Sequence, residues 1–582
     1  MALQINIHPS TFTMSDIKLH KIGIERITID EEVGSVSEVT DFKELRSVRS
    51  KTGAGEVNYI NSAGPVDDNQ LLAEIGYKQE LSRQFSTIQV FGIAFSIMGL
   101  LPSIASVMAG GLGGGSVSLV WGWFISGIFI LMIGATMAEN ASAIPTAGGL
   151  YYWTYYYAPE GYKEVLSFII GCSNSIALAA GICSVDYGLA EEILAAVIIS
   201  KDGNFTPTSG MTYGVFAAAV VSMVLCTSVA SKAVARLQAF SICANLFIII
   251  LLFIALPIGT KNKYGGFNDG AFIFGKFQNF SDWNNGWQFC IAGLMPAIWT
   301  IGSFDSCVHQ SEEAKDAKRS VPIGIMGSIT ACWVLGWMIL ICLMACVDKD
   351  MDRVINNPYG FAMAQIVYDS LGKKWAIAFM SLIAFCQYLM GSSIVTAISR
   401  QAYAFARDDG LPFSKYIKRV GKTSKIPFFA ILFSCTISLL LGLLCLIDAT
   451  AANALFSLAV AGNYVSWSTP TIMRLTFGKD LFRPGPFYLG DFWSPTISWI
   501  GVIFQYFIIL IVMFPSQQKG LTKNTMNYAC VIGPGLWFLS WVYYMVYKKK
   551  YYHGPKSNLS DEQYIDAVGA DVIDEMLAPK SE

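Results

Sequence analysis

Two long apolar stretches of the sequence each contain, near their middle, residues that interrupt a helix. Residues 95–103 read Phe-Ser-Ile-Met-Gly-Leu-Leu-Pro-Ser, and residues 295–305 read Met-Pro-Ala-Ile-Trp-Thr-Ile-Gly-Ser-Phe-Asp. A break in a membrane helix frees N–H and C=O groups, which must then face a cavity or a ligand because hydrocarbon cannot satisfy them. The amino end of a half-helix attracts a carboxylate, and freed carbonyls accept hydrogen bonds from an ammonium group. The two stretches therefore predict a site for a small zwitterionic or cationic molecule.

These stretches belong to the first and the sixth apolar runs of the chain, so they occupy corresponding positions in two halves of five helices each. A paired interruption of this kind is typical of a transporter site near the bilayer midplane. The alternative is two kinked helices that simply pack against their neighbours, since Gly and Pro are common in spanning helices.

Ionisable residues inside or beside apolar runs are a second group that could do chemistry, because burying them in a membrane is costly. Asp186 lies toward the outer end of the third run, and Asp305 lies in the inner half of the sixth. A carboxyl in a low-dielectric cavity binds protons more readily, which is what a proton-coupled step requires. Four others lie near run ends, namely Glu139, His309, Glu312 and Glu313. For these the alternative is interfacial structure, such as gate salt bridges to Arg400 or Arg407.

No set of residues indicates an enzyme. No nucleophile and base recur at catalytic spacing, and the glycine-rich stretch 110–115 lacks the Lys of a phosphate-binding loop. The 13 cysteines fall within apolar runs and lack zinc-site spacing, so we interpret them as small apolar helix residues rather than disulfides or metal ligands. We expect no cofactor and no metal, and the net charge of −2 gives no reason to expect nucleic acid as a partner.

The elements that must position these residues are membrane helices. The 582 residues are 53% hydrophobic and 14% charged, a balance far from that of soluble proteins. A spanning helix needs about 20 mainly apolar residues. Twelve runs qualify, near 88–108, 118–138, 165–187, 211–230, 236–258, 288–308, 322–346, 375–399, 427–447, 452–473, 496–515 and 525–546. The predicted fold class is therefore an all-α integral membrane protein with twelve transmembrane helices.

Lys and Arg are concentrated in 309–321, 400–426 and 548–550, which share one side of a twelve-span chain, so both termini are predicted to be cytoplasmic. Residues 1–80 lack the apolar core of a signal peptide. We expect a cytoplasmic lead at 1–86, one five-helix repeat at 87–258, a second at 288–473, two further helices at 496–546 and a cytoplasmic tail at 547–582. Two sequons on the opposite side, at Asn204 and Asn279, are possible glycosylation sites, with chance occurrence as the alternative.

Three stretches resemble signatures of the amino acid–polyamine–organocation superfamily. They are ENASAIPTAGGLY at 139–151, EEAKDAKRSVP at 312–322, and Ser399-Arg400 together with ARDDGLP at 406–412. A narrower match covers nearly the whole chain: RSKTGAGEVNY at 49–59, IGYKQEL at 75–81, IGSFDSCVHQ at 301–310 and AVGADVID at 567–574 resemble the fungal 4-aminobutyrate (GABA) permeases of the amino acid/choline transporter family. This resemblance implies a leucine-transporter-like fold of inverted five-helix repeats with broken helices 1 and 6.

The resemblance also implies where the substrate binds. The unwound part of helix 1 is expected at Ser96, Ile97, Met98, Gly99, Leu100 and Leu101, with the amides of the last three holding a carboxylate. That of helix 6 is expected at Trp299, Thr300, Ile301, Gly302 and Ser303, with carbonyls facing an amine and Trp299 as an aromatic gate. Relatives commonly carry a Gly-Ser-Gly break in helix 1, which this chain lacks. Some proton-coupled relatives carry a helix 5 lysine, and its position here is Asn245. Asp186, Asn245, Asp305, Glu139 and Arg400 are thus the coupling or gate candidates.

The function implied is a secondary active transporter for GABA or a related ω-amino acid, with protons as the coupling ion and the lipid bilayer as its environment. The alternatives are a polyamine, choline or neutral amino acid carrier on the same scaffold, or a transporter-like nutrient sensor. The sequence is compatible with either the plasma membrane or the vacuolar membrane.

Overall fold

The computed structural model describes residues 72, 75–228, 231–421, 425–446, 449–515, 517–522 and 526–557, together with the strands β1 (Arg26–Ile27) and β2 (Val39–Thr40). The chain divides into two compact units. One comprises 1–79 and 555–582, in which β1 and β2 pair antiparallel. The other comprises 80–554 and contains every long helix. The quoted stretches at 49–59 and 567–574, like most of the predicted cytoplasmic lead and tail, lie outside the described residues.

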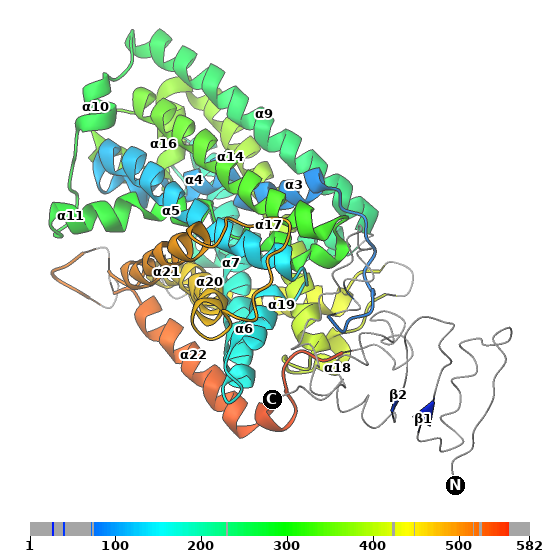
Figure 1. The fold of residues 1–582 in the computed structure, drawn as a ribbon. Coiled ribbons are helices and arrows are strands. Elements are labelled where there is room, and N and C mark those ends of the chain that lie inside the picture. Colours follow the sequence, from blue (N-terminus) through cyan, green and yellow to red (C-terminus); the bar gives the residue numbers. More distant parts are fainter. Residues whose placement is uncertain are drawn as a thin grey trace. The chain divides into compact units, whose positions relative to one another are not determined.

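Ten helical segments among the described residues are long and apolar enough to cross a membrane. The first is interrupted and consists of α3 (Thr87–Met98) and α4 (Leu100–Leu112). The others are α5 (Gly115–Ala143), α7 (Lys163–Ser200), α8 (Ser209–Thr227), α9 (Ser231–Tyr264), α14 (Ala317–Cys346), α17 (Lys373–Arg407), α19 (Phe428–Gly442) with the 3₁₀ turn η5 (Leu443–Leu446), α21 (Trp493–Ile511) and α22 (Ala529–Val546). The chain is therefore an all-helical, multi-pass integral membrane protein (Figure 1).

The remaining two predicted runs are also helical. The sixth consists of α11 (Asn285–Gln288), a π-helical turn η3 (Phe289–Gly293), α12 (Met295–Thr300) and α13 (Ser306–His309), each too short to span alone. The tenth is α20 (Ala449–Thr476). The sequence did not predict the short elements outside the spans, because none is long enough to read as a span. They are α6 (Gly149–Tyr157), α10 (Gly270–Gly275), α15 (Met351–Ile355), α16 (Ala362–Leu371), α18 (Ser414–Ile417) and the 3₁₀ turns η4 (Ser311–Glu313) and η6 (Lys548–Lys550).

Connecting segments meet at two opposite ends of the helical unit. At one end Lys373 pairs with Asp202 at 2.6 Å, which joins the α7–α8 connection to the start of α17. At the other end Lys548 Nζ donates to the carbonyls of Asp409 and Leu411, which docks η6 on the α17–α18 connection. In Figure 1, α10 and α11 lie toward the first end and α18 toward the second. The segments 309–321, 400–426 and 548–550 meet at the second end, where Arg400 pairs with Glu313 and Lys548 contacts Asp409.

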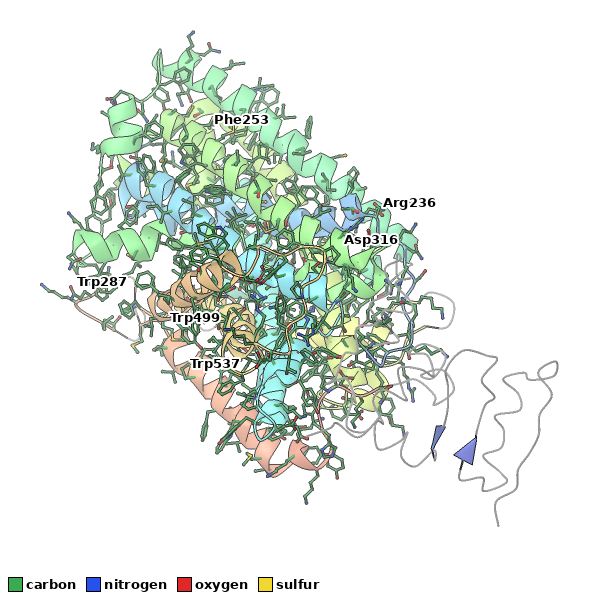
Figure 2. All side chains as sticks on the ribbon, viewed as in Figure 1. Arg236, Phe253, Trp287, Asp316, Trp499 and Trp537 are labelled. Carbon is green, nitrogen blue, oxygen red and sulfur yellow. The ribbon has the colours of Figure 1, made fainter. Side chains whose placement is uncertain are left out.

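Close helix packing in the unit depends on glycine. A Cβ on Gly122 of α5 would lie 2.1 Å from the Gly293 carbonyl, so these two backbones touch where the sixth segment is π-helical. Gly336 of α14, which has no Cβ, likewise leaves room for the buried ring of Trp123. By contrast, large apolar side chains point outward from the peripheral helices, as lipid contact requires. Trp287 and Trp499 are 40% and 41% exposed and are labelled in Figure 2.

Candidate substrate site between two interrupted helices

The interruption of the first helix is a single residue. Gly99 has φ 43° and ψ 60°, the left-handed conformation that glycine adopts without a Cβ penalty. A Cβ there would lie 2.5 Å from Met390 Sδ of α17, so close packing also requires glycine. The predicted unwound stretch 96–101 is thus too long, because residues 96–98 continue α3 and Leu100 and Leu101 begin α4.

Most hydrogen bonds at this break are already made within the chain. The Gly99 N–H donates to the Phe95 carbonyl at 3.2 Å, and the Ser103 hydroxyl donates to the Met98 carbonyl at 2.7 Å. The Gly99 amide is therefore engaged in the helix C-cap, contrary to the expectation that it holds a carboxylate. The hydroxyl of Ser96, which is fully buried, has no partner among the described residues.

The interruption of the sixth helix is longer and more open. Helix α12 ends at Thr300 and α13 begins at Ser306, so the break runs from 301 to 305, two residues further along than predicted. Ser303 has φ 56°, an uncommon backbone conformation for a residue other than glycine. Within the described part of the chain, no backbone N–H donates to the carbonyls of Trp299, Thr300 and Ile301. These carbonyls can therefore accept hydrogen bonds from a ligand.

A cavity lies against this second break. Its walls are Ile97 of α3; Ala177, Leu178, Gly181 and Val185 of α7; Ile298, Trp299, Thr300, Gly302 and Ser303 in and after α12; Met390 and Ile394 of α17; and Ala459, Val460, Asn463, Tyr464 and Trp467 of α20. Its volume is about 30 Å³, room for about two water molecules. The walls must therefore move apart before an amino acid can enter.

The cavity wall carries neutral polar groups that lack partners. The Thr300 hydroxyl, the Tyr464 hydroxyl and the Trp467 indole N–H are buried, and no hydrogen-bond partner lies within reach of them in the described residues. No charged side chain lines the cavity. Burying a polar group without a partner is unfavourable, so such a cluster around a cavity indicates a site that a polar ligand completes.

Aromatic rings form one side of the site. The Trp299 ring packs on Phe456 with centroids 4.5 Å apart, and Trp467 contacts both Phe304, at 4.5 Å, and Tyr464, at 5.2 Å. Aromatic faces attract ammonium groups. Trp299 was expected from the sequence, but Tyr464 and Trp467 were not, because α20 has no interruption to mark it. The available signal was their i, i+3 spacing beside Asn463, which places three polar-tipped side chains on adjoining faces of one helix.

The last residue of the second break, Asp305, carries a buried carboxylate. Asn174 Nδ2 of α7 donates to Asp305 Oδ2 at 3.2 Å, and Asn174 also lies 3.5 Å from the Oδ1 of Asn463, a cavity residue. His309 Nε2 lies 3.6 Å from Asp305 Oδ2, while its Nδ1 lies 3.0 Å from the Ala147 carbonyl. Asp305 is thus connected to the cavity through α7 and α20, and through His309 to the segment that precedes α6.

The other coupling candidates lie apart from this cluster. Asp186 of α7 is fully buried beside Gly391 of α17, and neither of its oxygens has a partner among the described residues. The preceding residue, Val185, lines the cavity. Asn245 of α9 is buried and donates to the Ser241 carbonyl one turn away at 2.9 Å, so it does not reach the cavity.

Ion pairs close the end of the unit at which 309–321 and 400–426 meet. Arg400 Nε donates to Glu313 at 2.7 Å, and Arg407 donates to Glu312 through both terminal nitrogens at 3.1 and 3.0 Å. The predicted gate pairs to these two arginines are thus present for Glu312 and Glu313. Glu139 instead pairs with Arg474 of α20 at 2.9 Å, because the ends of α5 and α20 meet there with Ser494 of α21.

The segment before α3 reinforces this closure. The amides of Gln84 and Phe85 donate to the Glu313 carbonyl at 2.9 and 3.0 Å, and the Lys315 amide donates to the Phe85 carbonyl at 3.0 Å. Tyr403 of α17 donates to Glu80 at 2.6 Å. The start of the first helix and the end of the sixth are therefore joined by main-chain hydrogen bonds on this side of the cavity.

Comparisons with known proteins agree with this architecture. The amino acid permease family profile matches residues 85–537. A GABA-specific permease of Saccharomyces cerevisiae is 72% identical, with 97% of this chain and 99% of that protein aligned. An uncharacterised amino-acid permease of Schizosaccharomyces pombe is 33% identical over 93% of this chain and 97% of that protein, and an amino-acid permease of Arabidopsis thaliana is 30% identical over 85% and 97%. The chain is a transporter and not an enzyme, and it belongs to the amino acid permease family.

Proposed function

We propose that this permease carries GABA or a related ω-amino acid across its membrane by proton symport. The observation that carries the proposal is the neutral, partly unsatisfied cavity against the broken sixth helix, in a chain 72% identical to a protein named a GABA-specific permease. A cavity lined by dipoles without a net charge suits a zwitterion, whose two charges need a donor group and an acceptor group rather than one counter-ion.

The two ends of the cavity wall differ in what they offer. The carbonyls of residues 299–301 and the face of Trp299 can only accept hydrogen bonds or attract a cation, so we assign them the substrate ammonium. The Tyr464 hydroxyl and the Trp467 indole N–H are donors, so we assign them the carboxylate. The substrate then bridges α12 and α20. The permease therefore selects substrates by the distance between their ammonium and carboxylate groups.

Transport follows if the site opens alternately to the two sides. In our proposal α20 and the interrupted sixth segment also cross the membrane, which gives twelve spans arranged as inverted repeats at 87–258 and 288–473. The end closed by the Glu312–Arg407 and Glu313–Arg400 pairs faces the cytoplasm, together with both termini. Breaking these pairs opens the route inward. Either the plasma membrane or the vacuolar membrane is compatible with this orientation.

We assign the coupling proton to Asp186. Both of its oxygens lack partners, and it adjoins the cavity through Val185. A buried carboxylate without a partner is strongly disfavoured in its charged form, so its occupancy by a proton changes how α7 and α17 pack. Asp305 is the second candidate, but one of its oxygens already accepts a hydrogen bond from Asn174.

Uptake of radiolabelled GABA into cells lacking their own GABA transport tests the substrate assignment. Unlabelled putrescine, choline and neutral amino acids serve as competitors for the alternative carriers. We expect Gly302→Leu to abolish uptake, because a Cβ there would already lie 3.1 Å from the Trp299 carbonyl. Gly214→Leu on α8 is the matched control, since nothing lies within 4 Å of its Cβ position. Uptake of labelled putrescine but not of labelled GABA would favour a polyamine carrier, and uptake of none of these compounds would leave the nutrient-sensor alternative.

Coupling is tested separately, in proteoliposomes. We expect an imposed proton gradient to drive GABA accumulation by the wild type, and Asp186→Asn to retain GABA exchange while losing that accumulation. Sodium-dependent, gradient-insensitive accumulation would refute proton coupling and leave the substrate assignment intact.

A further inference from the structure

Helix α7 carries a second buried carboxylate that none of the steps above uses. Glu192 is fully buried, and neither of its oxygens has a hydrogen-bond partner among the described residues. Asp186, six residues earlier, is in the same situation. No Lys, Arg or His in the described part of the chain lies within ion-pair distance of either group. An ionisable group within a spanning helix is by default a candidate functional residue. Two such groups on one helix indicate a path along which a proton could move.

The groups that face the two carboxylates are all neutral except one. Glu192 faces Ser106 of α4 and Cys386 of α17, with Glu191 beside it on its own helix. Three weak acids from three elements lie near Asp186, namely Cys183 of α7, Tyr388 of α17 and Cys435 of α19. The nearest ionisable neighbours therefore add no positive charge that would hold either carboxylate ionised.

Their positions along α7 form a series with the cavity. The helix rises about 1.5 Å per residue, so Asp186 lies about 8 Å beyond Gly181 in the cavity wall and Glu192 about 9 Å beyond Asp186. The hydrocarbon core extends about 15 Å on each side of the midplane. If the cavity lies at the midplane, Glu192 is at the outer edge of the core, on the orientation proposed above.

Polar groups of two other helices lie against α7 between the two carboxylates. Gln387 of α17 donates to the Val185 carbonyl at 2.9 Å, and its Oε1 has no partner among the described residues. Gly188 lies between the carboxylates, and a Cβ there would lie 3.0 Å from the Ser106 hydroxyl and 3.3 Å from Gln387 Nε2. Because Gly188 has no side chain, Ser106 of α4 and Gln387 of α17 face the part of α7 between Asp186 and Glu192.

We propose that Glu192 is the outer proton-loading group of the permease and that it passes its proton to Asp186. This rests on the proton symport proposed above. One O–H bond breaks at Glu192 as one forms at Asp186, by way of water beside Ser106 and Gln387, and Glu192 then takes a proton from the external solution. The step needs no co-reactant besides water. It explains why two unpaired carboxylates follow the cavity along one helix toward one side of the membrane.

The test uses the full-length protein in proteoliposomes and two rates for each variant. One is the initial rate of GABA uptake driven by an imposed proton gradient, and the other is GABA exchange without a gradient. For Glu192→Gln we expect the driven rate to fall by about 100-fold, the usual effect of losing a positioned proton-transfer group, with exchange unchanged. Glu192→Asp should recover part of the driven rate. Gly188→Ala should slow it without removing any titratable group. Glu160→Gln, which changes an exposed carboxylate just before the start of α7, is the control and should leave both rates unchanged.

The outcomes separate the two proposals. If Glu192→Gln keeps the wild-type driven rate while Asp186→Asn loses it, the relay is wrong and the symport stands. If Glu192→Gln loses driven uptake and exchange together, and Glu192→Asp recovers neither, Glu192 is structural and the relay is again wrong. If the wild type itself ignores the proton gradient, the symport fails, and the relay fails with it.

Discussion

Replacing Tyr464 or Trp467 by Phe removes one hydrogen-bond donor from the cavity and keeps an aromatic ring in place. In the proposed site each donor contacts the substrate carboxylate. A hydrogen bond to a charged group contributes about 1.5–3 kcal/mol, which corresponds to about a 10- to 150-fold rise in the Michaelis constant for GABA per donor lost. Tyr464 is 2% exposed and Trp467 4%, so solvent does not replace the lost donor.

The same variants make an opposite prediction for stability. In the ligand-free protein the Tyr464 hydroxyl is buried without a partner in the described residues. Such a group destabilises by about 1–3 kcal/mol, so Tyr464→Phe should unfold at a higher temperature than the wild type while it transports GABA poorly. If Tyr464 had a purely structural role, its substitution would instead lower both the unfolding temperature and GABA transport.

The assay is the initial rate of radiolabelled GABA uptake against concentration, with thermal unfolding of the purified protein in parallel. Tyr506→Phe on α21, where the ring is 47% exposed, is the control and should change neither. Putrescine lacks a carboxylate, so any inhibition of GABA uptake by putrescine should have the same inhibition constant in Tyr464→Phe as in the wild type. An unchanged Michaelis constant in both variants, or equal losses for GABA and putrescine, would refute the assignment of these donors to the carboxylate.

Three further predictions concern the scaffold. Glu139→Ala leaves the buried Arg474 guanidinium without its carboxylate, so it should lower the free energy of unfolding in detergent by about 3 kcal/mol. Glu160→Ala, which breaks an exposed pair, should not, and equal unfolding temperatures for the two variants would contradict this. Gly336→Ala forces a methyl to within 2.0 Å of the Trp123 ring and should cost about 1–3 kcal/mol, while Gly214→Ala should not destabilise. Glycosylation is expected at Asn204 and not at Asn279, because Asn279 Nδ2 already donates to the Trp283 carbonyl and to Asn285. Endoglycosidase should therefore shift the electrophoretic mobility of the wild type and of Asn279→Gln but not of Asn204→Gln. Loss of the shift in Asn279→Gln would show that Asn279 is the glycosylated residue.

The spans were predictable because each is set by one strong signal, the length of an apolar run. The run predicted at 322–346 is α14 at 317–346, and that at 211–230 is α8 at 209–227. The error at α7, predicted at 165–187 and observed at 163–200, has a physical reason. Its C-terminal part carries Glu191 and Glu192, which end an apolar run in sequence but not a helix that other helices surround.

The site was predictable only where backbone chemistry leaves a mark in sequence. Gly99 and Gly302 marked the two breaks, but the extent of each break depends on tertiary hydrogen bonds such as that from Ser103 to Met98. The donors on α20 and the pairing of Glu139 with Arg474 depend on which helices meet in space. Residue types alone do not specify such contacts, since any of several arginines has the right charge.

In the proposed site the substrate bridges the freed carbonyls of the sixth helix and the donors of α20. A structure determined in the presence of saturating GABA would show whether it does. We expect the ammonium within hydrogen-bond distance of the carbonyls of residues 299–301 and the carboxylate at Tyr464 and Trp467, in a cavity wider than the present about 30 Å³. GABA bound elsewhere, or bound with its carboxylate against the α12 carbonyls, would contradict it.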